Sequence, residues 1–153
     1  MKLDEIDIQL LSELQKNGRK TIKELSQEIG ISASPTFERI KKLEKSGIIT
    51  GYSANIDAEK LGKKLYAFAH IGLKEHSKEA VDKFTDQVLA IPQVMECHYT
   101  SGDTDFIIKI LVENMDSYNE FVLTKLFEMA NIGKIETYLS LSVVKNTNSI
   151  ALV

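Results

Sequence analysis

Apolar residues recur at every third or fourth position through the first 46 residues, which is the pattern of amphipathic helices. The spacing predicts three helices, over residues 4–16, 21–29 and 33–46. Asp4 precedes the first of them as an N-cap residue. The apolar positions expected to form the shared core of the three helices are Leu14, Leu25, Phe37, Ile40 and Leu43.

The junction between the second and third helices carries a series of start and stop signals. Thr21 is followed three residues later by Glu24, the spacing of a capping box. Gly30 follows the last apolar position of the second helix, where a left-handed residue commonly ends a helix. Ser32 then precedes the third helix as its N-cap residue. This order of signals predicts a helix-turn-helix.

The outward face of the third helix carries small hydroxyls near its start and basic side chains after them. Hydroxyls permit close approach to base edges or phosphates, and Lys and Arg reach phosphates on either side of a groove. A basic helix face is also common as a solvated surface, and its coincidence with the helix-turn-helix signals is what favours DNA. The predicted DNA-binding residues are Thr21, Ser32, Ser34, Thr36, Arg39, Lys41, Lys42 and Lys45.

The hydrophobic pattern changes after Gly47. Residues 51–57 alternate polar and apolar side chains, which predicts a strand, and residues 58–64 form a polar connector. Beyond them the pattern predicts strands over residues 65–73, 94–100, 105–112 and 135–144, and helices over residues 78–91 and 117–129.

The β-α-β-β-α-β order after residue 65 predicts a ferredoxin-like antiparallel sheet with both helices on one face. The fold class is therefore α+β, with an N-terminal winged or three-helix helix-turn-helix domain followed by a ferredoxin-like domain. We expect the first domain at residues 1–50, a linker strand and connector at residues 51–64, and the second domain at residues 65–153.

The sheet face away from the two helices is expected to carry large side chains. A second copy of the chain would cover such a surface, which predicts a homodimer. The candidate residues are Tyr66, Phe68, His70, Met95, Tyr138 and Leu139.

Charge is distributed unevenly along the chain. The 153 residues include 19 Lys and Arg against 22 Asp and Glu, a formal net charge of −3, which is not typical of a nucleic-acid-binding protein. Residues 14–52, however, hold eight basic side chains against four acidic ones. A locally basic module on an acidic body is expected to bind DNA in a salt-sensitive way.

Several classes of protein are disfavoured. No motif of the GxGxxG, P-loop, GxSxG or HExxH type occurs, and the three histidines show no metal-ligand spacing with Cys97. We therefore expect no enzyme, no catalytic residue, no metal and no cofactor.

The single cysteine excludes an internal disulfide, and we expect Cys97 to be a sheet residue. The start of the chain lacks the apolar run of a signal peptide and no segment is long enough to span a membrane, so we expect a cytoplasmic protein without a membrane partner.

Five stretches of the chain together resemble the Lrp/AsnC (feast/famine) family of bacterial and archaeal transcriptional regulators, over the whole length. These are LDEIDIQLLSELQKNGR at 3–19, IKELSQEIGIS at 22–32, RIKKLEKSGIITGYSANID at 39–57, LG at 61–62 and SGDTDF at 101–106. Two features depart from the family pattern. Ala33 stands where the family often has Pro, and Arg39 is the only Arg of the third helix.

The resemblance implies a DNA-binding regulator that forms dimers and assembles into tetramers, octamers or larger rings. It also implies a small effector, usually an amino acid, bound near the interface between dimers. The family's effector turn falls on Thr100, Ser101, Gly102, Asp103, Thr104 and Asp105, and Tyr138 is a further candidate from another subunit.

The chemistry of the turn fits that expectation, because main-chain N–H groups can hold an α-carboxylate and an Asp can accept from an α-ammonium. The same Ser-Gly-Asp-Thr sequence also suits a simple hairpin turn. An alternative also remains for the function of the whole chain, which is an amino-acid sensor or assembly protein that does not bind DNA.

Overall fold

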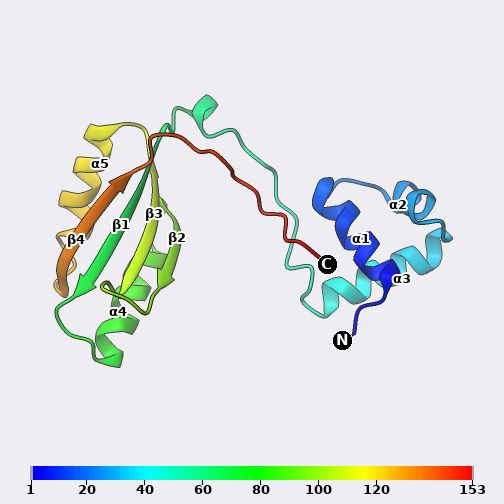
Figure 1. The fold of residues 1–153 in the computed structure, drawn as a ribbon, viewed down its shortest axis with the longest axis horizontal. Coiled ribbons are helices and arrows are strands. Elements are labelled where there is room, and N and C mark those ends of the chain that lie inside the picture. The colour runs from blue at the N-terminus through cyan, green and yellow to red at the C-terminus, as the bar shows by residue number, and fades with distance from the viewer. Residues whose placement is uncertain (1, 153) are drawn as a thin grey trace. The chain divides into compact units, whose positions relative to one another are not determined.

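The computed structural model describes residues 2–152 and divides into two compact units (Figure 1). The first unit comprises the chain up to Asn55 together with the residues from Lys145 onward. The second unit is Ile56–Val144. The C-terminal residues therefore belong with the helical unit, whereas the sequence pattern grouped them with the sheet.

The first unit contains the three expected helices, α1 (Glu5–Lys16), α2 (Ile22–Ile29) and α3 (Ala33–Lys45). Their ends follow the capping signals. The Asp7 N–H donates to the Asp4 carboxylate at 2.9 Å, and the Asp7 carboxylate accepts from the Asp4 N–H at 3.2 Å. Gly30 ends α2 with a φ of 80°, a conformation that costs glycine no steric strain.

The expected core of this unit is wrong at one position. Leu25, Ile40 and Leu43 are buried as expected. Phe37, however, is 44% exposed, and Thr36 is fully buried with its hydroxyl donating to the Ser32 carbonyl at 2.9 Å. The inward stripe of α3 thus runs through 36, 40 and 43, with four-then-three helical spacing. Thr36 fits this stripe because it returns its hydroxyl to its own helix.

Residues 51–57 form no strand, so that expectation is wrong. They are exposed, and no described strand lies beside them to complete a ladder of hydrogen bonds. Among residues 2–152, this unit therefore contains three helices and no strand that could form the wing of a winged helix-turn-helix. A short 3₁₀ turn, η1 (Glu59–Leu61), follows in the connector.

The second unit has the predicted ferredoxin-like topology. Its elements are β1 (Leu65–Leu73), α4 (Lys78–Leu89), β2 (Val94–Tyr99), β3 (Phe106–Val112), α5 (Met115–Phe121), the π-helical turn η2 (Val122–Leu126) and β4 (Ile132–Leu139). The four strands are antiparallel in the order β2-β3-β1-β4.

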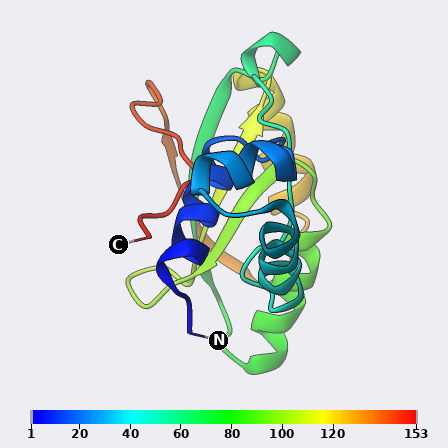
Figure 2. The same cartoon turned by 90° about the vertical axis from the view of Figure 1, so that its right-hand side faces the viewer.

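Both helices cover the same face of the sheet (Figures 1 and 2). Alternate residues of the two central strands point into the layer between sheet and helices, as the burial of Ala69 and Ile108 illustrates. Phe84 from α4 and Phe121 from α5 belong to the same core. Leu89, the last residue of α4, is 75% exposed.

The expected bounds of the last strand are wrong at both ends. β4 begins at Ile132 rather than 135, and it ends at Leu139 rather than 144. The pairing explains the earlier end, since Leu139 lies opposite Ala67 near the start of β1 and the Ser140 N–H makes the last ladder contact, to the Tyr66 carbonyl. Beyond that point only Leu65 of β1 remains, so the strand has no partners that would carry it to residue 144.

Candidate DNA-binding and effector-binding sites

The exposed side of α3 carries a cluster of three lysines, Lys41, Lys42 and Lys45. Lys41 lies 2.8 Å from the Glu44 carboxylate, and its Nζ atom lies 5.7 Å from the centre of the Phe37 ring. The hydrogen bond from Lys41 lowers the pKa of Glu44. Lys42 and Lys45 have no ion-pair partner among the described residues. These two amines are therefore free to meet an anionic surface.

The expected hydroxyls have different environments. Ser34 is exposed at the start of α3, and the Ser32 side chain makes no capping hydrogen bond. Thr21 is engaged with its own helix, since its hydroxyl donates to the Glu24 carboxylate at 2.8 Å. Thr36 is buried and cannot meet DNA, so its assignment to the outward face is wrong.

Arg39 is held by two carboxylates. Its Nη1 atom lies 2.7 Å from both Asp4 and Asp7, and its side chain is 29% exposed. The bond to Asp4, followed by that to Asp7, raises the pKa of the guanidinium. The pKa of Asp4 is lowered by the Asp7 N–H first and by Arg39 second. Arg39 thus ties α3 to the capping box of α1, a long-range pairing that the sequence pattern did not indicate.

The expected effector turn closes the hairpin between β2 and β3. The Thr100 N–H donates to the Asp105 carbonyl at 2.8 Å, and the Thr100 hydroxyl donates to the Thr104 carbonyl at 2.8 Å. Ser101, Gly102 and Asp103 form the exposed tip. Among residues 2–152, no acceptor faces the main-chain N–H groups of this tip.

The two acidic residues of the turn differ in availability. Asp105 is occupied, since its carboxylate accepts from the Leu73 N–H at 2.7 Å and lies 3.0 Å from Nδ1 of His76. Asp103 is exposed. Lys134 of β4 is close enough for the charge of Asp103 to contribute to its raised pKa, although its bond to Glu136 is the larger cause. Sequence reasoning missed His76 and Lys134, because only the strand register brings them to the turn.

Tyr138 lies on the outer face of the sheet, away from the helices. Its ring centre is 4.9 Å from that of His70. The Asp105 N–H donates to the carbonyl of Ile71 in β1, and Ile71 lies opposite Ile135 of β4. Tyr138 is three residues farther along β4 than Ile135, which is roughly 10 Å at the rise per residue of a strand. Within one chain the structure does not bring Tyr138 to the effector turn.

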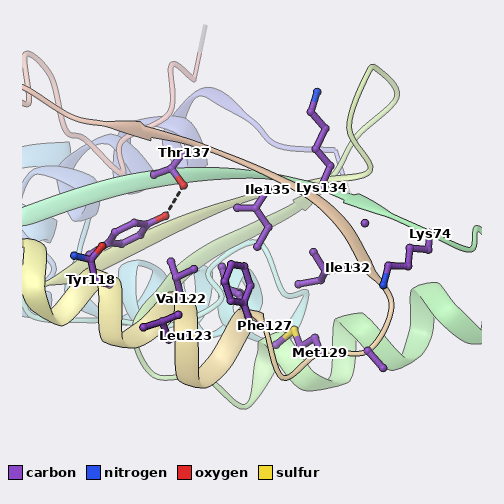
Figure 3. Close-up of a pocket in the computed structure, with 14 residues that line it drawn as sticks. Lys74, Tyr118, Val122, Leu123, Phe127, Met129, Ile132, Lys134, Ile135 and Thr137 are labelled. Atoms are coloured by element: carbon purple, nitrogen blue, oxygen red, sulfur yellow. Dashed lines mark hydrogen bonds between the residues drawn. The ribbon is translucent and has the colours of Figure 1, made fainter.

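A cavity of about 760 Å³ lies between β4 and the end of α5 (Figure 3). Apolar side chains form most of its wall, and the Tyr118 and Thr137 hydroxyls are hydrogen-bonded to one another at one end. Figure 3 shows the Lys134 side chain pointing away from this cavity. None of residues 100–105 lines the cavity, so the cavity and the candidate effector turn are separate features.

Cys97 was expected to be a residue of the sheet. Cys97 packs against the core of the sheet unit, and burial raises the pKa of its thiol, as expected for a sheet residue. In the described part of the chain no helix is long and apolar enough to cross a membrane.

A helix-turn-helix with exposed lysines, joined to a separate ferredoxin-like unit, is the arrangement expected of a DNA-binding protein that carries a second domain. Residues 3–50 match the family described as winged helix-turn-helix DNA-binding, and residues 66–150 match the Lrp/AsnC ligand binding domain. The chain belongs to the Lrp/AsnC family of transcriptional regulators.

Individual relatives agree with this assignment. The leucine-responsive regulatory protein of Rhizobium meliloti is 38% identical over 95% of this chain and 94% of its own length. That of Escherichia coli K12 is 33% identical over 98% and 92%. A Neisseria meningitidis transcriptional regulator solved in complex with L-Met superposes with a TM-score of 0.94 at 32% identity, covering 99% of this chain and 97% of its own. Escherichia coli AsnC gives a TM-score of 0.90 at 25% identity, over 97% and 99%.

Proposed function

We propose that this chain binds double-stranded DNA through α3 and that an amino acid modulates its assembly or its DNA binding. The observation that carries the DNA part is the exposed pair Lys42 and Lys45, without ion-pair partners among the described residues, on a capped helix-turn-helix with Ser34 exposed at the helix start. The lysines supply phosphate contacts and Ser34 stands where the start of a recognition helix approaches base edges.

For the effector we propose the tip of the turn between β2 and β3. The main-chain N–H groups of residues 101–103 suit an α-carboxylate, and the exposed Asp103 suits an α-ammonium. The neisserial relative described with L-Met supports an amino acid as the ligand class. Asp105 then has a supporting role, since it holds the turn to the end of β1.

We further propose that the outer sheet face is a homodimer interface and that dimers assemble into tetramers or octamers. Tyr66, Phe68, Ile107 and Leu111 alternate with the buried positions of β1 and β3 and face away from the helices. Lys109 and Glu136 lie on the same face, so it is a mixed apolar and charged surface, and a second copy of the chain would cover its apolar part and pair with its charges. Tyr138 lies on this same face, so packing of two copies through it would bring Tyr138 of one copy toward the turn of the other.

A titration of the protein against its own upstream DNA, at two salt concentrations, tests the DNA proposal. Specific binding that weakens steeply with salt supports it, because phosphate contacts release counterions. Absence of binding at low salt would favour the amino-acid sensor without DNA binding. Repeating the titration with each amino acid tests the effector, and an effector must bind one state better than the other to change the result.

A further inference from the structure

The C-terminal residues of the chain contact the last turn of α1. The Ile150 N–H donates to Oε1 of Gln15 at 2.7 Å, and Nε2 of Gln15 donates to the Ile150 carbonyl at 3.1 Å. Just before this contact the Ser149 N–H donates to the Thr147 hydroxyl at 3.1 Å, which turns the chain. The Gln15 side chain thus forms hydrogen bonds with both the N–H and the carbonyl of Ile150, as a residue of a neighbouring β-strand would.

The segment that leaves the first unit also contacts this end of α1. A Cβ atom placed on Gly18 would lie 3.2 Å from the Tyr52 ring, so the ring rests on the main chain there. The Tyr52 hydroxyl donates to the Glu44 carboxylate at 3.1 Å. The two chain segments that connect the units, before residue 56 and after residue 144, therefore both attach to the first unit near the end of α1.

We propose that the end of α1 is a docking surface for the C-terminal segment of the same chain, and that residues 145–152 act as a releasable second tether of the helix-turn-helix unit. Gln15 recognises the main chain and not the Ile150 side chain, which is exposed. Two solvent-exposed hydrogen bonds contribute little net free energy, so the docked segment opens and closes readily. When it is released, only the connector before residue 56 restrains the helical unit.

Hydrogen exchange of the full-length protein, with analysis of the C-terminal peptide, tests the docking. In Gln15→Ala the Ile150 amide is expected to exchange roughly tenfold faster, the change that loss of its acceptor produces. Gln9→Ala is the matched control, because Gln9 is exposed on the same helix and the substitution alters helix propensity equally. Ile150→Ala keeps both main-chain groups and is expected to exchange like the unaltered chain.

Anisotropy decay of a dye on the helical unit tests the tether. The dye is attached at Lys23→Cys, an exposed position of α2, in a Cys97→Ser background. Gln15→Ala is expected to enlarge the fast component of the decay, and Gln9→Ala is expected to leave it unchanged. The proposal is overturned if Gln15→Ala leaves both measurements unchanged, or if Ile150→Ala releases the segment as fully as Gln15→Ala does.

Discussion

The Nη1 atom of Arg39 lies 2.7 Å from Oδ1 of Asp7, which joins the middle of α3 to the first turn of α1. Asp7 is buried, so its carboxylate depends on this partner. A basic side chain of α3 therefore has a structural role in holding that helix in place.

Replacing Arg39 by Ala is expected to lower the free energy of unfolding by about 1–2 kcal/mol, because Asp7 would lose its charged partner. Lys42→Ala, on the same helix but without an ion pair among the described residues, should change stability by less than about 0.5 kcal/mol. Urea unfolding measures both. Equal stability of the two variants would show that the Arg39 pairs are not structural.

The lysine cluster leads to the second prediction. If Lys42 and Lys45 each contact a phosphate, replacing both by Ala should reduce the slope of log affinity against log salt by about 0.9 for each lost contact. Replacing both Lys78 and Lys83 by Ala, at two exposed positions of α4, removes the same total charge and is the control. Fluorescence titration at several salt concentrations gives the slopes. An unchanged slope in the double variant would contradict the assignment of α3 to the DNA interface.

Local signals in the sequence predicted the helical unit closely. Asp4, Thr21 and Gly30 act through hydrogen bonds and φ angles within a few residues, so their effect is readable from spacing alone. The last strand was predicted less well, because its end depends on where β1 stops offering partners. That limit is set by pairing between distant segments, which a single strand pattern does not contain.

The candidate sites show the same division. The resemblance to the family placed the candidate effector turn at residues 100–105, and the residue types there also suited a hairpin turn, which the chain forms between β2 and β3. Arg39 was assigned to the outward face because its partners, 35 and 32 residues away, are not visible from helical periodicity. Lys134 reaches the turn only through the β1–β4 register. Sequence therefore located the loops and helices that carry the sites, while tertiary pairing decides which side chains are free to act.

The third prediction concerns acid stability. Hydrogen bonds from Lys16 first and from Lys20 second lower the pKa of Glu13 from 4.5 to about 2. Because the pKa of Glu13 is lower in the folded state than in the unfolded chain, its ionised carboxylate stabilises the fold fully above pH 4.5. That stabilisation is lost as the pH falls from 4.5 toward 2. Glu13→Gln should flatten the pH dependence of the melting temperature in this range. High salt should reduce the difference between the two proteins, since these charges are near the surface.

The fourth prediction separates the two acidic residues of the effector turn. Asp105→Ala should destabilise the protein by about 1–3 kcal/mol, because the Leu73 N–H would lose its acceptor. Asp103→Ala should leave stability within about 0.5 kcal/mol and reduce the rise in melting temperature that an effector amino acid produces. Thermal unfolding with and without each amino acid measures both effects. A full ligand-induced rise in Asp103→Ala would remove Asp103 from the proposed site.

The fifth prediction concerns the outer sheet face. Phe68 lies on this face between Lys109 of β3 and Tyr138 of β4, where a partner's sheet would bury it. Phe68→Glu should place a charge in that interface and dissociate the dimer, since an unpaired buried carboxylate is costly.

Leu89→Glu is the matched control, because it introduces the same charge at an exposed apolar residue on the helix side of the unit. Light scattering coupled to size-exclusion chromatography should give half the subunit number or less for Phe68→Glu and an unchanged number for Leu89→Glu. If only the control dissociated, the contact surface would lie on the helices. An unchanged mass for Phe68→Glu would show that another copy does not cover the sheet, and the proposed approach of Tyr138 to a neighbouring turn would then have no basis.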